Sequence, residues 1–128
     1  MNPVGLGIDL VEVPRVAKMI ERFGDRALNR VLTPAERAYC ESKAAIEQHV
    51  AARLAVKEAA FKALAAAGDV PYMGWLEFEV ARAIDGSPTL RFHGRARALA
   101  TRLKVEVTHV SLTHTESYAA AVVVVYRE

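Results

Sequence analysis

The sequence predicts a single α+β domain over residues 1–128, in which a long central helix packs on a mainly antiparallel sheet. Residues 51–68 are rich in alanine and leucine and contain no proline, and Gly68 stands where a helix would end. Apolar runs that are typical of strands lie near both ends of the chain. Helices and strands do not alternate regularly, which argues against a parallel sheet built from βαβ units.

Residues 4–13 form an apolar run that predicts the first strand, and Asp9 is conspicuous within it. One interpretation is that Asp9 lies at the end of the strand and caps the next element through its side chain. The other is that its carboxylate is an oxygen ligand for a metal or a general base at the mouth of the core. This segment alone does not decide between them.

The next segment is predicted to be a helix that begins at Pro14 and ends at Gly24. Its apolar stripe consists of Val16, Met19, Ile20 and Phe23. Basic side chains project from the other side at helical spacing: Arg15, Lys18 and Arg22. A stripe of this kind is either a solvated face or a docking surface for an acidic protein partner.

A second, shorter helix is predicted from Thr33 to Ser42. Thr33 suits the N-cap position, Pro34 the first turn, and Glu36 completes a capping box. Residues 43–49 are interpreted either as a polar connection or as an extension of the helix that follows.

Two sets of charged residues lie on the central helix. Glu58 and Lys62 share one broad face with Leu54, Phe61 and Ala65, while Arg53 and Lys57 form a basic pair on an adjacent face. Glu58 and Lys62 either form an ordinary surface ion pair, which contributes roughly 0.2–0.5 kcal/mol, or belong to a functional site, since charges in apolar surroundings are costly unless they are paired or bound.

The remainder of the chain predicts two β-segments separated by a helix. After a loop at 69–74, a strand is expected at 75–83, a turn at 85–88 and a hairpin partner at 89–92. A helix is expected at 95–103 and a strand at 105–112. The last strand, 118–126, is continuously apolar and is therefore predicted to be central.

The composition excludes several classes of protein. The formal net charge is +2 and no basic run is present, so a nucleic-acid module is only a minor alternative. Cys40 is the single cysteine, which excludes an intrachain disulfide and a multi-cysteine zinc site. We see no secretory signal and no apolar run long enough to span a bilayer, so we expect a cytoplasmic protein.

Several stretches together resemble holo-[acyl-carrier-protein] synthase, the AcpS-type 4′-phosphopantetheinyl transferase. They occur in the order of that family and cover essentially the whole chain: 7–10, 32–36, 52–63, 86–88, 109–115 and 118–121. The most specific of them is the Lys-Glu-Ala-x-x-Lys-Ala pattern at 57–63. The resemblance implies the 4′-phosphopantetheinyl transferase fold. It also implies Mg²⁺-dependent transfer of 4′-phosphopantetheine from coenzyme A to a serine of an acyl carrier protein, in support of fatty acid biosynthesis.

The resemblance also implies roles for individual residues. Asp9 and Glu58 would bind Mg²⁺, a cation that prefers carboxylate, phosphate and water oxygens. Lys62 would contact the diphosphate of coenzyme A, with Arg53 and Lys57 as further phosphate contacts. The serine proton would pass to Glu58, to Asp9 or to a metal-bound water, and the sequence does not choose among these.

Further implied roles concern the nucleotide and the protein partners. Gly86, Ser87 and Pro88 resemble the turn beside the adenine nucleotide, although hairpin geometry alone also accounts for them. His114 would border the coenzyme A site. Arg15, Lys18 and Arg22 would receive the acidic carrier protein, and the family precedent is a homotrimer with active sites at the subunit interfaces.

A non-catalytic module that binds coenzyme A or an acidic protein is the rival hypothesis. Such a module would keep Arg15 and Arg53 but would have no need for both Asp9 and Glu58. The presence of both carboxylates therefore favours the enzyme.

Overall fold

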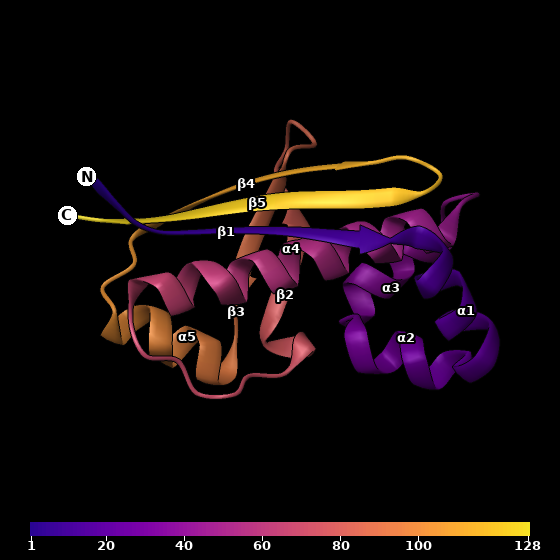
Figure 1. Cartoon of the computed structure of the whole chain (residues 1–128), viewed down its shortest axis with the longest axis horizontal. Coiled ribbons are helices and arrows are strands. Elements are labelled where there is room, and N and C mark those ends of the chain that lie inside the picture. The colour runs from indigo at the N-terminus through magenta and orange to yellow at the C-terminus, as the bar shows by residue number, and fades with distance from the viewer.

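The longest element is helix α4 (Ile46–Ala67), and the other elements are arranged around it (Figure 1). The computed structural model describes residues 1–128. Along the chain, the elements are β1 (Asn2–Glu12), α1 (Val13–Phe23), α2 (Asp25–Val31), α3 (Pro34–Glu41), α4, the 3₁₀ turn η1 (Trp75–Glu77), β2 (Phe78–Arg82), β3 (Pro88–Phe92), α5 (Gly94–Arg102), β4 (Val107–His114) and β5 (Tyr118–Arg127). Residues 46–49 thus extend the central helix, one of the two interpretations left open by the sequence.

The predicted α+β class is confirmed. β1, β5 and β4 form an antiparallel sheet in that order, with the apolar β5 at its centre as predicted, and β2 and β3 form a separate antiparallel hairpin. Figure 1 shows the three-stranded sheet lying along α4, with α1, α2 and α3 gathered at one end of this helix and α5 toward the other.

β1 alternates between two faces, as a strand requires. Gly5 and Gly7 are buried, whereas Leu6, Ile8 and Leu10 are about 60% exposed (60%, 62% and 63%) on the opposite face. A β-carbon at Gly7 would lie 1.8 Å from the carbonyl oxygen of Ala59. Glycine thus allows the backbone of β1 to pass directly against α4.

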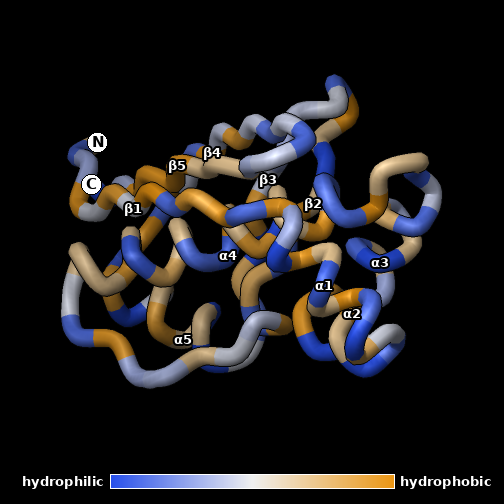
Figure 2. Tube along the Cα trace, turned by 45° about the vertical axis from the view of Figure 1, so that its right-hand side comes forward, coloured by the Kyte–Doolittle hydropathy of each residue, from blue (hydrophilic) through white to orange (hydrophobic).

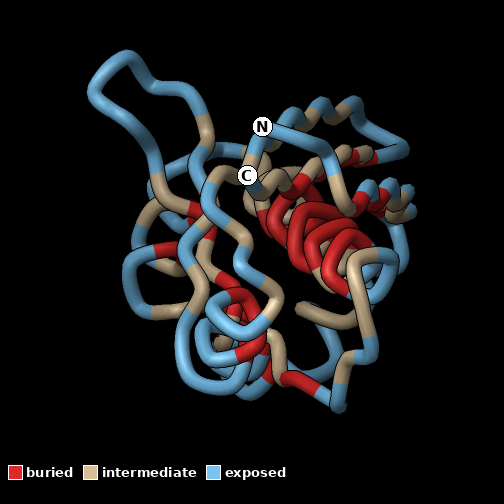
Figure 3. Tube along the Cα trace, turned by 90° about the vertical axis from the view of Figure 1, so that its left-hand side faces the viewer, coloured by how far each residue is buried: buried red, intermediate tan, exposed pale blue.

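The core is built mainly on α4. Four of its alanines, Ala55, Ala59, Ala60 and Ala63, are fully buried in one cluster with Val123 and Val125 of β5, which are also fully buried. Figure 3 shows the buried residues concentrated along this helix, and Figure 2 shows hydrophobic residues along the sheet and a larger share of hydrophilic ones on α1, α2 and α3. Alanine side chains keep the helix close to the sheet and bury apolar area, the main favourable term in folding.

The predicted capping box at the start of α3 is present. The Thr33 hydroxyl accepts from the Glu36 amide at 3.3 Å, and the Glu36 carboxylate accepts from the Thr33 amide at 2.8 Å. Glu36 is nevertheless buried, with 2% of its surface exposed, so it has partners beyond the cap.

Three segments differ from the sequence-based prediction. Residues 25–31 form α2, which was not predicted. Residues 75–77 form η1 and not the beginning of a strand, so Leu76 is exposed. β4 extends to His114, so Thr113 and His114 lie on a strand rather than in a loop. No helix is both long and apolar enough to cross a membrane.

Candidate active site

Asp9 lies within β1 and pairs with a charged residue of α4. The ammonium of Lys62 donates to the Asp9 carboxylate and to the carbonyl oxygen of Ile8, both at 3.0 Å. Asp9 pairs with Ala121 in the sheet, and the residue at the N-cap of α1 is Glu12. The capping interpretation of Asp9 is therefore wrong, and so is the interpretation of Lys62 as the partner of Glu58 in an isolated surface pair.

Glu58 is half-buried and faces the same region as Asp9. Burial raises the pKa of its carboxyl group above the ordinary value, the negative charge of Asp9 raises it further, and Lys62 acts in the opposite direction. None of the ion pairs or side-chain hydrogen bonds of the chain involves Glu58, since Lys62 is directed to Asp9. Two neighbouring carboxylates that are balanced by a single ammonium favour the binding of a further cation.

The donor set fits Mg²⁺ better than a transition metal. The chain contains no group of three or more His, Cys, Asp or Glu side chains that could hold a metal ion. Mg²⁺ does not need such a group, because it is usually bound by one or two carboxylates together with waters and substrate phosphates. Asp9 and Glu58 can supply those two carboxylates.

Asp9 and Glu58 open into a hollow of about 700 Å³ between β1, α1, α2 and α4, which we call the carboxylate hollow. Its wall is partly apolar, with Met19, Phe23 and Trp75 among its residues, and partly basic. Of the basic stripe predicted on α1, Arg15 lines the hollow, whereas Lys18 and Arg22 are exposed outside its lining. Arg26 and Arg30, one turn apart on α2, also line it. Sequence reasoning missed them because α2 was not predicted, although their i, i+4 spacing was a usable signal.

Arg53 lies at a second, smaller hollow of about 260 Å³, which we call the arginine hollow. Its lining also includes Arg82 and Pro88. Arg53 is only 4% exposed; one of its terminal nitrogens donates to the carbonyl oxygen of His49 at 3.3 Å, but its Nε has no partner within the chain. An unpaired buried donor is costly, so this nitrogen is available to an anionic ligand.

Cations surround Tyr39 beside the arginine hollow. The guanidinium carbons of Arg53 and Arg82 lie 4.3 Å and 4.5 Å from the centre of its ring, and the ammonium of Lys43 lies 4.9 Å from it. Arg82 also donates to the Tyr39 hydroxyl. This concentration of positive charge matches a phosphate-bearing ligand.

The remaining residues predicted at the nucleotide lie at two places. Gly86 and Ser87 are exposed at the tip of the β2–β3 hairpin, and Gly86 has a positive φ of 87°, as a tight turn requires. His114 is at the end of β4, where its Nδ1 lies 3.0 Å from the Gln48 amide oxygen and its ring packs edge-on against His49.

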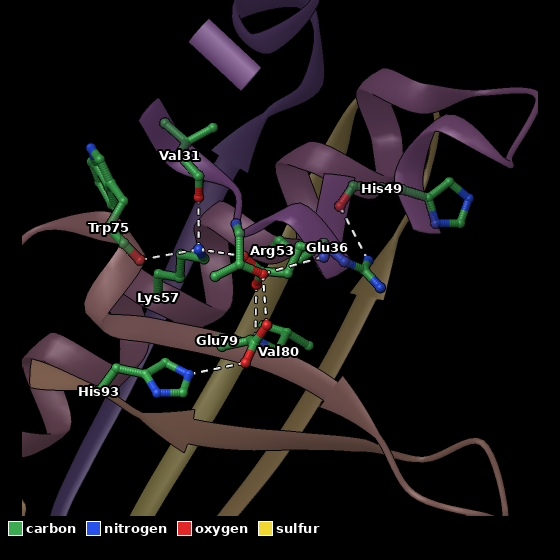
Figure 4. A network of polar contacts seen from close by, with 10 residues as sticks. Val31, Glu36, His49, Arg53, Lys57, Trp75, Glu79, Val80 and His93 are labelled. Atoms are coloured by element: carbon green, nitrogen blue, oxygen red, sulfur yellow. Dashed lines mark hydrogen bonds and ion pairs between the residues drawn. The ribbon is translucent and has the colours of Figure 1, made fainter. Parts of the chain in front are cut away.

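Lys57 does not lie with the other predicted phosphate contacts. Its side chain is fully buried, and its ammonium donates to the Val31 carbonyl at 2.6 Å, to the Glu36 carboxylate at 2.7 Å and to the Trp75 carbonyl at 3.0 Å (Figure 4). An ammonium has three N–H donors, so none is left for a phosphate. Burial lowers the pKa of Lys57, and the charge of Glu36 opposes this shift. The prediction that Lys57 contacts the diphosphate is not supported by this geometry.

Comparison with known proteins gives consistent matches over the whole chain. The family model of the 4′-phosphopantetheinyl transferase superfamily matches residues 5–123. The holo-[acyl-carrier-protein] synthase of Koribacter versatilis (strain Ellin345) is 50% identical over 121 residues, which cover 94% of this chain and 96% of that protein.

Solved structures extend the match to three dimensions. The Helicobacter pylori holo-[acyl-carrier-protein] synthase in complex with coenzyme A has a TM-score of 0.80 and 28% identity, over 94% of this chain and 99% of that one. The Mycobacterium tuberculosis acyl carrier protein synthase has a TM-score of 0.76 and 34% identity, over 99% and 100% of the two chains.

Proposed function

Because the chain belongs to the 4′-phosphopantetheinyl transferase superfamily, we propose that it transfers 4′-phosphopantetheine from coenzyme A to a serine of an acyl carrier protein. The relatives named holo-[acyl-carrier-protein] synthase, one of them solved with coenzyme A, support this substrate pair. The observation that carries the proposal for this chain is the grouping of Asp9, Lys62 and Glu58 at the carboxylate hollow.

The reaction makes one phosphorus–oxygen bond and breaks another. The serine oxygen attacks the β-phosphorus of coenzyme A, the bond to the bridging oxygen breaks, and adenosine 3′,5′-bisphosphate leaves. Phosphoryl transfer depends chiefly on positioning and on neutralising charge on the phosphate oxygens. Lys62 would contact the diphosphate, and its 51% exposure and its ion pair with Asp9 support this role. Glu58, whose pKa is raised by burial, is the protein group best suited to accept the serine proton.

Asp9 and Glu58 are the residues that would hold Mg²⁺, as the donor set described above supports. When bound, Mg²⁺ would neutralise phosphate charge and orient the diphosphate for in-line displacement. The positive charge of the ion would offset the repulsion between the two carboxylates.

The arginine hollow is proposed to take the nucleotide end of coenzyme A. The unpaired Nε of Arg53 and the cations around Tyr39 support phosphate binding there, and Pro88 supplies an apolar edge for the adenine. His114 and the exposed turn at Gly86 and Ser87 are assigned to the border of this nucleotide site.

The proposal includes a homotrimer with active sites between subunits. Within one chain, Asp9 and Glu58 line one hollow and Arg53 and Pro88 line another. A neighbouring subunit that brings its arginine hollow to the carboxylate hollow would complete the site. Leu6, Ile8 and Leu10 offer an exposed apolar face of the sheet for the contact between subunits. We place the reaction in the cytoplasm, together with the carrier protein that it would modify.

Incubation of the protein with coenzyme A, Mg²⁺ and an apo acyl carrier protein tests the proposal. We expect intact-protein mass spectrometry to show one added phosphopantetheine on the carrier, at the expense of coenzyme A. A serine-to-alanine carrier protein is the control and should stay unmodified. No mass increase with several apo carriers would contradict the proposal and favour the non-catalytic module.

Charge reversal on α1 separates the two substrates. We expect the double substitution Arg15→Glu and Arg22→Glu to raise the KM for carrier protein at least about tenfold, since opposite charges at a rim steer association and like charges repel. The KM for coenzyme A should change much less, because neither residue lines the arginine hollow, where the nucleotide end is proposed to bind. Steady-state kinetics with each substrate varied in turn measures both values, and equal increases in both would contradict the docking role.

A further inference from the structure

We propose that Lys57 is a positioning residue, which fixes the wall of the carboxylate hollow that faces the carrier protein. The functional part of this inference rests on the proposed function. Its structural part depends only on the contacts of the Lys57 ammonium and can be tested without catalysis.

Two of the three acceptors of Lys57 belong to the wall of the carboxylate hollow. Val31 is the last residue of α2 and Trp75 is the first residue of η1, and both line the hollow together with Glu58. Lys57 precedes Glu58 on α4. The Lys57 ammonium therefore links two separate segments of the wall to α4, at the position next to the proposed metal ligand Glu58.

The third acceptor, Glu36, extends the network to α3 and β2 (Figure 4). One of its carboxylate oxygens accepts from Lys57 and from the Thr33 amide, and the other accepts from the Val80 amide at 2.8 Å. The side chains of Lys57 and Glu36 are both fully buried. Because every donor of the ammonium is used, the network defines one position for each attached segment.

An ion pair that only stabilised the fold would not need the additional contacts of Lys57 with the Val31 and Trp75 carbonyls. Buried pairs can often be replaced by apolar residues without loss of stability. Here the Lys57 ammonium satisfies the last carbonyl of a short helix, which has no backbone partner, and is a second donor to the Trp75 carbonyl, which also accepts from the Phe78 amide. An apolar replacement would leave the Val31 carbonyl without a donor and would remove the link between Trp75 and α4.

The chain provides its own probe of this wall, since Trp75 is its only tryptophan. Acrylamide quenching of its fluorescence reports the accessibility of the wall in the full-length protein. The test compares wild type with Lys57→Met, which keeps an unbranched side chain as far as the ε position and removes the ammonium. Val125→Ala, a truncation in the sheet core outside the lining of the hollow, is the matched control for lost stability.

In Lys57→Met we expect quenching of Trp75 to increase at least about twofold and kcat/KM for carrier protein to fall by about 10- to 100-fold, the usual result of misplaced groups. The dissociation constant for coenzyme A, measured by calorimetry, should stay within about twofold of wild type, because Lys57 does not touch this ligand. Val125→Ala should lower the Tm with Trp75 quenching unchanged.

The double substitution Glu36→Gln and Lys57→Met covers the case in which the single variant does not fold. It leaves no unpaired buried charge, so its Tm should exceed that of Lys57→Met, while Trp75 quenching stays elevated and kcat/KM for carrier protein stays lowered. Weaker coenzyme A binding with unchanged Trp75 quenching would overturn the proposal in favour of a phosphate contact. Quenching and carrier kinetics both equal to wild type would also overturn it. If wild type transfers nothing but Trp75 responds as expected, the proposed function fails and the positioning of the wall stands.

Discussion

Substitution of Glu58 by glutamine is expected to reduce kcat by about 10²- to 10³-fold, the loss seen when one group that stabilises the charge of a transition state is removed. Glutamine keeps the shape of the side chain but supplies a neutral oxygen, so both a metal ligand and the best-placed proton acceptor are lost. Half-maximal activity should also require more Mg²⁺. Single-turnover transfer to the carrier protein, measured across a Mg²⁺ titration, checks both effects.

The Tm of the Glu58→Gln variant should not fall. Burial and the charge of Asp9 raise the pKa of Glu58 in the folded protein, so its ionised form is less favourable there than in the unfolded chain. At neutral pH a neutral side chain removes that cost. Glu47→Gln, at a carboxylate in the first turn of the same helix and outside both hollows, is the control and should keep wild-type turnover. Full turnover with an unchanged Mg²⁺ requirement in Glu58→Gln would show that the assignment is wrong.

The same variant tests whether sites are shared between subunits. Arg53→Gln is expected to be impaired at the nucleotide and Glu58→Gln at the metal. When the two chains are co-expressed, some interfaces of a mixed trimer combine an intact Glu58 from one subunit with an intact Arg53 from another. Activity above that of either variant alone is therefore expected. The absence of any recovery in proven mixed oligomers would place each site within one chain.

The sequence predicted the elements whose patterns depend on local residues. The alanine-rich α4, the capping box of Thr33 and Glu36 and the central β5 all follow from short-range rules, and each is present. α2 was missed because its seven residues lie between two helix signals and carry only a short pattern of their own. The strand predicted from Trp75 begins only at Phe78. The Trp75 carbonyl accepts from the Phe78 amide within the 3₁₀ turn and from Lys57, so residues 75–77 form η1 instead of a strand.

The roles of charged residues were harder to predict. The spacing of residues along a helix shows which of them share a face, but not which other elements that face contacts. Lys62 and Lys57 both have phosphate-binding charge and lie on the same helix. Tertiary packing separates them: Lys62 reaches β1 and is half-exposed, whereas Lys57 is enclosed by α2, α3 and η1. The partner of Lys62 was Asp9, which is far away in sequence, and only the close packing of β1 on α4 brings the two together.

That packing predicts a large effect of substituting Gly7 by alanine. The added methyl group would lie 1.8 Å from the carbonyl oxygen of Ala59 and 2.8 Å from the amide nitrogen of Ala63, which are backbone atoms inside a helix and cannot rotate away. β1 or α4 must shift, and we expect a loss of at least about 3 kcal/mol in the free energy of unfolding, the upper part of the usual range for overpacking. For a domain of this size the Tm should fall by about 10 °C. Chemical denaturation and thermal scans measure these two changes.

The effect of Gly7→Ala should reach the active site, since Asp9 follows two residues later on the same face of β1. A shift of the strand would separate the Asp9 carboxylate from Lys62 and Glu58, and a displacement of about 1 Å is enough to cost about 100-fold in kcat. Gly74→Ala is the control: its methyl group would lie 3.7 Å from the Glu77 carboxylate, an ordinary contact, and its φ of −83° is open to any residue. A Tm for Gly7→Ala equal to that of wild type would mean that β1 and α4 are not in backbone contact. If Gly7→Ala lowers the Tm but keeps full activity at temperatures below its unfolding transition, Asp9 keeps its position without the glycine. The close packing of β1 on α4 would then contribute to stability and not to catalysis.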